Sequence, residues 1–194
     1  VIAPLEATFP IPKPKIFNKS TNKFTIGVVG GGLVRKGYLY LLEAFSRLSL
    51  PDAELIILAN ETELRSCKKV RQLLDANVNI KIYGYVKDIN TFYALCDIFC
   101  LPSVDEGFGM VIMEAMASSL PIITTSNVGA SSYVKNHKNG FILPPRNIDL
   151  IIEKINFFYF KRNKIEEYGK ASYTLYKEFL DKNLYSRSLK RLIG

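Results

Sequence analysis

The chain has 194 residues, enough for one domain with a buried core and too few for two domains of ordinary size. A hydrophobic fraction of 48% with 23% charged residues is typical of a globular protein. No apolar run reaches the roughly 20 residues that span a bilayer, and the N-terminal segment lacks the order of a signal peptide. We therefore expect a cytoplasmic protein.

The net charge of +8 is concentrated toward the C-terminus, where residues 151–194 hold ten Lys and Arg against five Asp and Glu. Because bases and acids are interleaved there, a solvated helical face is favoured and no nucleic-acid partner is expected. Peripheral contact with a membrane stays open. Three cysteines give no disulfide framework, and the single histidine, His137, argues against a histidine-based metal site, so no metal is expected.

The elements follow one another as in a parallel sheet covered on both faces. Residues 1–23 contain four prolines and predict a linker. The predicted strands are Phe24–Val29, Glu54–Leu58, Ile80–Tyr83, Asp97–Leu101, Pro121–Thr124 and Phe141–Leu143. The predicted helices are the segment after Gly37, Glu61–Leu74, Asp88–Cys96, Met110–Ser118 and most of the chain after Asn147.

Six strands joined by right-handed crossovers predict a doubly wound, Rossmann-like α/β fold with the strand order 3-2-1-4-5-6. The expected division is a linker (1–23), a sheet domain (24–146) and C-terminal helices that pack on it (147–194). Ligands of such sheets bind beyond the carboxyl ends of the strands, near the switch point between the first and fourth strands. The loops that reach this point are 30–37, 84–87, 102–109 and 125–131.

The loop after the first predicted strand runs from Gly30 through Gly31 and Gly32 to Arg35 and Lys36. Its glycines allow close approach of the backbone to a ligand, and its two cations precede a helix whose dipole favours an anion. The loop predicts a phosphate site, with a plain glycine turn as the alternative. It fails the Walker pattern, and Arg35 stands where the dinucleotide fingerprint needs a third glycine, so an NAD-dependent oxidoreductase is a weaker alternative.

Two glutamates, Glu106 and Glu114, are eight positions apart, the first in a loop after the fourth predicted strand and the second in the apolar helix that follows. A carboxylate in a buried helix is costly unless it is paired or accepts hydrogen bonds. Hydroxyl groups of a sugar or a ribose are suitable partners. Gly107 and Gly109 free backbone N–H groups at the start of the helix, where a diphosphate or sugar oxygen can accept them.

The segment Glu106–Ala117 resembles the E-x7-E motif of the retaining glycosyltransferases with the GT-B fold, family 4 in particular, whose usual form is E-G-F-G-hydrophobic-x-hydrophobic-x-E-A-M-A. The flanks agree, in Gly84–Val86, Leu120–Ile123 and Asn139–Leu143. The resemblance runs from about Phe24 to Pro145. It covers the nucleotide-sugar-binding C-terminal domain of that family and nothing of the N-terminal acceptor domain.

This resemblance implies the site. Lys36 with Arg35 would bind the diphosphate of the sugar donor, Glu106 would approach the sugar, and Glu114 would accept hydrogen bonds from the ribose. Lys36, Arg35 and Glu106 are thus the implied catalytic residues. The implied donor-binding residues are Gly30, Gly31, Gly32, Tyr85, Val86, Gly107, Phe108, Gly109, Met110, Val111 and Glu114, with Tyr85 and Val86 contacting the base through backbone atoms. Many members carry an arginine where this chain has Gly31.

The implied activity is that of a hexosyltransferase, which moves a sugar from a nucleotide diphosphate-sugar, with retention, to an unknown glycan, lipid or small molecule. The chain has no D-x-D motif, and cations can replace a divalent ion, so neither a metal nor another cofactor is expected. The expected partners are the nucleotide-sugar and an N-terminal acceptor domain or partner chain. A catalytically silent nucleotide-sugar-binding domain is the alternative.

Overall fold

The computed structural model describes residues 23–182 of the chain, so the predicted linker up to residue 22 and the helical prediction for residues 183–194 lie outside it. Within the described residues six strands form one sheet in the order β3-β2-β1-β4-β5-β6, and every pairing is parallel. The strands are β1 (Phe24–Val29), β2 (Ala53–Leu58), β3 (Ile80–Tyr83), β4 (Ile98–Leu101), β5 (Ile122–Thr125) and β6 (Gly140–Leu143). The predicted α/β fold and strand order are confirmed.

Strand boundaries differ from the prediction by one residue at β2, β4, β5 and β6. The start of β4 shows why. Asp97, predicted as its first residue, instead ties the end of helix α4 (Ile89–Leu95) to the sheet. Its amide donates to the Thr25 carbonyl at 2.7 Å, and its side chain accepts from the Thr25 amide at 2.8 Å. A polar side chain that replaces a ladder bond ends the regular strand.

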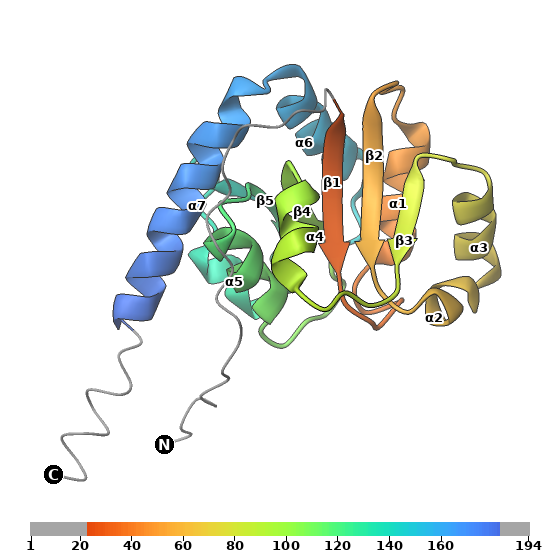
Figure 1. Ribbon diagram of the computed structural model, residues 1–194, viewed down its shortest axis with the longest axis horizontal. Helices are drawn as coiled ribbons and strands as arrows, with labels where there is room; N and C mark the ends of the chain where they lie inside the picture. The colour runs from red at the N-terminus through yellow and green to blue at the C-terminus, as the bar shows by residue number, and fades with distance from the viewer. Residues whose placement is uncertain (1–22, 183–194) are drawn as a thin grey trace, which may run out of the picture.

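The helices cover both faces of the sheet (Figure 1). The helical elements are α1 (Tyr38–Arg47), α2 (Glu61–Arg65), α3 (Lys68–Asp75), α4 (Ile89–Leu95), α5 (Met110–Ala117), the 3-10 helix η1 (Gly129–Tyr133), α6 (Ile148–Phe160) and α7 (Asn163–Lys182). One face carries α1 with α3 and α6 beside it, and the other carries α4 and α5 with α7 packed along α5. Within the described residues, no helix combines the length and the apolar character that crossing a membrane requires.

The predicted single helix Glu61–Leu74 is wrong, because the segment forms two helices, α2 and α3. Cys67 adopts an extended conformation between them, and the hydroxyl of Ser66 donates to the Glu63 carbonyl at 2.6 Å. Such a side-chain bond to the backbone competes with continuation of a helix. Arg65 holds the pair together through Glu61 at 2.7 Å and Asp75 at 2.6 Å.

The C-terminal helices are fastened to the opposite end of the sheet from the strands' carboxyl ends. Asp52, just before β2, accepts hydrogen bonds from Tyr159 and from Arg162, the latter at 2.9 Å. The Arg162 guanidinium also lies 4.7 Å from the ring centre of Phe24, a cation–π contact. These contacts hold the turn between α6 and α7 against β1 and β2.

The basic residues of α6 and α7 are largely paired with acids on the same helix. Lys154 contacts Glu153 at 2.6 Å, and Lys170 contacts Glu166 at 2.6 Å. Lys164 contacts Glu167 at 2.7 Å. Each of these three lysines is therefore neutralised by an acid of its own helix.

Gly37 joins the fold to the site, because it stands between the loop after β1 and helix α1 with a φ of 71°. A Cβ atom at this position would lie 2.1 Å from the carbonyl oxygen of Pro102, which follows β4. The two chain segments can approach this closely only around a glycine.

Replacing Gly37 by alanine should therefore lower the free energy of unfolding by about 2 kcal/mol or more, since it combines an unfavourable φ with a backbone collision. Urea denaturation followed by circular dichroism measures the change. Gly84→Ala is the matched control, because a Cβ there would meet no atom within 4 Å. Equal stability of the two variants would contradict the role given to Gly37.

Candidate functional site

Two loops meet at the switch point between β1 and β4. We call residues 30–37 the glycine loop and residues 102–109 the glutamate loop. The amides of Val104 and Asp105 both donate to the Arg35 carbonyl, at 2.8 and 3.3 Å. Together with the close approach of Gly37 to Pro102, these bonds fix the two loops against each other. The site is thus built from segments that are about 70 residues apart in sequence.

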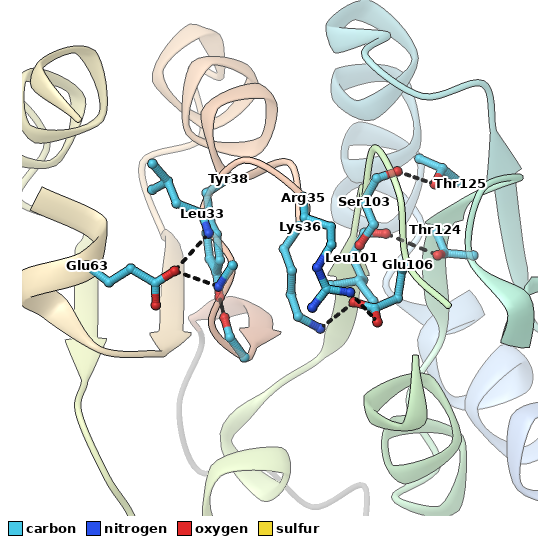
Figure 2. A network of polar contacts seen from close by, with 12 residues as sticks. Leu33, Arg35, Lys36, Tyr38, Glu63, Leu101, Ser103, Glu106, Thr124 and Thr125 are labelled. Carbon is cyan, nitrogen blue, oxygen red and sulfur yellow. Dashed lines mark hydrogen bonds and ion pairs between the residues drawn. The ribbon is translucent and has the colours of Figure 1, made fainter. Parts of the chain in front are cut away.

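Lys36, Arg35 and Glu106 form what we call the ion cluster (Figure 2). Lys36 Nζ lies 2.9 Å from Glu106 Oε2, and Arg35 Nη1 lies 2.9 Å from Glu106 Oε1. Lys36 is 7% exposed, whereas Arg35 is largely open to solvent. Two cations against one carboxylate leave one surplus positive charge at the edge of the sheet where ligands bind.

The environment of Glu106 keeps it ionised. Burial alone raises the pKa of its carboxyl, but the hydrogen bonds and charges of Lys36 and Arg35 outweigh burial and hold that pKa below its ordinary value. A carboxylate in this state is suited to holding cations and hydroxyl groups. It is not suited to donating a proton at neutral pH.

Glu114 has a different environment. It lies on α5, and its Oε2 accepts a hydrogen bond of 2.7 Å from the hydroxyl of Tyr93 on α4. Burial raises the pKa of the Glu114 carboxyl, and the Tyr93 hydrogen bond and the Lys36 charge offset only part of this rise. The sequence predicts that a carboxylate in this apolar helix needs a partner, and that partner is a tyrosine from the preceding helix. Nothing in the sequence indicates this role for Tyr93, because the residue stands in an apolar segment that is typical of a protein core.

The glutamate loop is held by the segment that follows β5. The Glu106 amide donates to the Asn127 carbonyl at 3.1 Å, and the Phe108 carbonyl accepts from Ala130 at 2.7 Å. Gly129 makes this possible, because a Cβ on it would lie 2.3 Å from the Gly107 carbonyl oxygen. These contacts hold the loop against the segment after β5 at the start of α5.

Aromatic rings extend the support of the glutamate loop. The rings of Phe108 and Tyr133 have centres 6.3 Å apart, and Phe179 on α7 lies 4.9 Å from Tyr133. Phe108 and Met110 are each 38% exposed, so they remain accessible beside the ion cluster. Val111, the next predicted ligand residue, is half-buried in α5.

The threonines at the end of β5 form hydrogen bonds with the last residue of β4 and with the start of the glutamate loop. Thr124 donates to the Leu101 carbonyl at 3.0 Å, and Thr125 donates to the Ser103 carbonyl at 2.5 Å (Figure 2). Both hydroxyls are buried and bonded, so they stiffen the start of the glutamate loop. Sequence reasoning did not single them out, since threonine is also an ordinary strand residue.

Several amides of the glycine loop are bonded to acceptors within the protein. The amides of Gly32 and Leu33 donate to Glu63 Oε1 on α2, at 2.7 and 3.1 Å. The amide of Lys36 donates within the loop, to the Gly32 carbonyl at 2.8 Å. The amide of Gly37 likewise donates to a loop carbonyl. These four amides are therefore already bonded within the protein.

Glu63 is a residue of the site that sequence reasoning missed. The pattern Asn60-x-x-Glu63 has the form of a capping box, in which the glutamate bends back to its own helix. Asn60 does cap α2, accepting from the Glu63 amide at 3.1 Å. The Glu63 carboxylate instead reaches the glycine loop. The sequence pattern does not reveal this, because it fits a return bond to the Asn60 amide equally well.

Tyr85 and Val86 lie in the loop after β3, at the same edge of the sheet as the glycine loop. The side chain of Tyr85 is 86% exposed, and Val86 packs against the core. Their expected backbone contacts with a base stay a prediction. His137, in contrast, is exposed in the turn before β6, far along the chain from the ion cluster, as a surface residue is expected to be.

The pKa values of the two glutamates should be shifted in opposite directions. We expect the Glu106 carboxyl to have a pKa below, and the Glu114 carboxyl a pKa above, that of an ordinary glutamate. Carbon-detected NMR of the carboxyl groups against pH measures both, and Lys36→Met should move the Glu106 pKa upward. Because folded Glu106 binds its proton more weakly than the unfolded chain does, its stabilisation is present above the ordinary pKa. It is lost as the pH falls through the lowered folded value. An unshifted Glu106 in both proteins would exclude the ion cluster.

Comparison with known proteins agrees with this geometry. The sequence model of the family described as "Glycosyl transferases group 1" matches residues 12–175. An uncharacterized glycosyltransferase of Haemophilus influenzae is 32% identical over 149 residues, which cover 75% of this chain and 42% of that protein. The UDP-Gal:alpha-D-GlcNAc-diphosphoundecaprenol alpha-1,3-galactosyltransferase of Escherichia coli is 30% identical over 149 residues, covering 74% of this chain and 38% of that protein.

A solved structure shows the same fold. The crystal structure of Anabaena Alr3699/HepE in complex with UDP and glucose superposes with a TM-score of 0.76 at 23% identity, over 87% of this chain and 48% of that one. The chain thus spans less than half the length of each of these proteins. A family model that covers most of the chain, joined to this fold and to the paired glutamates at its switch point, shows that the chain belongs to the group 1 glycosyltransferases.

Proposed function

We propose that this chain binds a nucleotide diphosphate-sugar and supplies the donor side of a sugar transfer that retains the anomeric configuration. The observation that carries the proposal is the ion cluster, in which a buried lysine and an arginine meet an ionised glutamate at the switch point. The name of the Escherichia coli relative gives UDP-Gal as its donor, and the Anabaena structure holds UDP and glucose. Both support a nucleotide-sugar as the ligand.

The proposed chemistry is departure of the nucleotide diphosphate. The bond between the anomeric carbon and the phosphate oxygen breaks, its electron pair stays on that oxygen, and the sugar gains oxocarbenium character. The acceptor hydroxyl oxygen then bonds to the anomeric carbon and passes its proton to the departing phosphate oxygen. Lys36 and Arg35 stabilise the charge that develops on the diphosphate. This charge does what a divalent cation does in other enzymes, so we propose a metal-independent reaction.

The two glutamates have separate proposed roles. Glu114 accepts hydrogen bonds from the ribose hydroxyls, with Tyr93 holding one of its oxygens in place. Glu106 orients Lys36 and Arg35 and contacts hydroxyls of the sugar. The carbonyls of Glu106 and Phe108 bind the segment after β5, an arrangement that supports ligand contacts by the amides of Phe108, Gly109 and Met110 at the start of α5. Neither glutamate acts as the proton donor in this scheme.

The acceptor is proposed to come from outside this chain. An N-terminal domain or a partner chain would cover the carboxyl edge of the sheet and bring the acceptor, a glycan, a lipid or a small molecule. Peripheral contact with a membrane fits a lipid-linked acceptor, such as the alpha-D-GlcNAc-diphosphoundecaprenol that the name of the Escherichia coli relative gives.

Calorimetric titration of the chain with UDP-, GDP- and ADP-sugars tests the binding proposal and identifies the base. Lys36→Ala and Glu114→Ala should each weaken binding of the preferred nucleotide by about 1–3 kcal/mol, because each removes charge-assisted hydrogen bonds. Lys138→Ala is the matched control, since this lysine is exposed in the turn before β6. Unchanged affinity in both site variants would remove the proposed site.

Sugar transfer should require the N-terminal domain or partner chain that binds the acceptor. We expect the 194-residue chain to bind the sugar donor while it transfers sugar slowly or not at all, with or without EDTA. Addition of the acceptor-binding domain or partner should restore transfer with retention, seen by NMR of the anomeric proton. Robust transfer by the chain alone would contradict this division of labour. Donor binding without transfer in the complete protein would favour the catalytically silent alternative.

A further inference from the structure

Glu63 lies on the opposite side of the glycine loop from the ion cluster (Figure 2). Its Oε1 accepts hydrogen bonds from two successive amides, those of Gly32 at 2.7 Å and Leu33 at 3.1 Å. A Cβ at Gly31 would lie 3.0 Å from the other oxygen, Oε2. The carboxylate is therefore seated closely against three consecutive residues of the loop, and a bulkier residue at position 31 would disturb it.

The support behind Glu63 is rigid. The side chain of Asn60 caps α2 and accepts from the Glu63 amide, and the Ser66 hydroxyl donates to the Glu63 carbonyl at 2.6 Å. The next residue, Leu64, is buried in the core. The backbone from which the carboxylate projects is thus fixed to the end of β2, so the two amide bonds transmit the position of the sheet to the loop.

The residues that Glu63 binds also hold the backbone around Lys36 in place. The Gly32 carbonyl accepts from the Lys36 amide at 2.8 Å, and the Leu33 carbonyl accepts from the Tyr38 amide at 3.3 Å. The Tyr38 hydroxyl in turn donates to the Gly30 carbonyl at 2.6 Å. Fixing the amides of Gly32 and Leu33 therefore fixes the turn from which the Lys36 side chain extends toward Glu106.

We propose that Glu63 is a positioning residue of the sugar-donor site, which holds the glycine loop so that Lys36 and Arg35 face the diphosphate. The inference rests on the proposed function, because it assigns Glu63 to the phosphate half of that same site. Glu63 does not touch the ligand in this assignment. Its effect is carried by the loop, so it acts on the phosphates and leaves the nucleoside contacts unchanged.

Binding of UDP and of UMP separates this role from a general one, since only UDP has the outer phosphate. If the panel of nucleotide-sugars selects another base, the pair is GDP and GMP or ADP and AMP. For Glu63→Ala we expect about tenfold weaker UDP binding, the size of one lost charge-assisted contact, and less than about threefold for UMP. Glu63→Gln should bind UDP nearly as the unchanged chain does, because its amide oxygen can still accept from both amides.

Two further variants complete the set. Glu61→Ala removes the same charge from an exposed position on the same helix and should leave both affinities unchanged. Glu63→Asp keeps the charge but shortens the side chain, so it should resemble Glu63→Ala. It replaces that variant if thermal unfolding shows that the alanine protein is not folded.

Three outcomes would overturn the inference. Tighter UDP binding by Glu63→Ala would mean that the carboxylate occupies the phosphate position and competes with the ligand. Equal loss for UDP and UMP would mean general support of the fold. Unchanged UDP binding in both Glu63→Ala and Glu63→Asp would mean that the loop needs no support. Failure of the unchanged chain to bind any nucleotide of the panel would instead refute the proposed function.

Discussion

The parallel pairing of β1 with β4, through Ile26 with Ile98 and Gly27 with Phe99, is the constraint on which the site depends. The chain reverses its direction of travel across the sheet at this pair, so the helices after β1 and β4 go to opposite faces and their loops are left facing each other. Gly27 allows the end of α4 to pack on β1, because a Cβ there would lie 2.3 Å from the sulfur of Cys96. The contacts between the glycine loop and the glutamate loop depend on this pairing of β1 with β4.

The ion cluster shows how the fold holds charge at a buried place. Removing Lys36 from water is costly, and a single carboxylate partner with good geometry offsets that cost. The same carboxylate binds the more exposed Arg35, so one residue orients two cations. Glu114 lies in the apolar environment of α5 and is held by a neutral hydroxyl. The two glutamates of one motif therefore differ in their electrostatics because of where their partners lie.

The sequence pattern was enough to predict the sheet, since short apolar runs such as Phe24–Val29 alternate with longer helical segments. The structure buries that run on both faces. The pattern was also enough to place Lys36 and Glu106 in one site, because loops after parallel strands meet at one edge. It failed where a side chain chooses a distant partner. Glu63 bonds to a loop 30 residues earlier, and Tyr93 bonds to a residue 21 positions later. The local sequence does not show which distant residue a side chain will bond to. It also does not show that the Ser66 hydroxyl will bond to the backbone where α2 ends and α3 follows.

The pairing of Lys36 and Arg35 with Glu106 has a consequence for the proposed reaction. A diphosphate that binds at this place would exchange with a carboxylate that already pairs with both cations, so the net gain in binding free energy would be the difference between two similar sets of contacts. When the nucleotide leaves, Glu106 would pair with both cations again. Product release would then leave no buried charge unpaired.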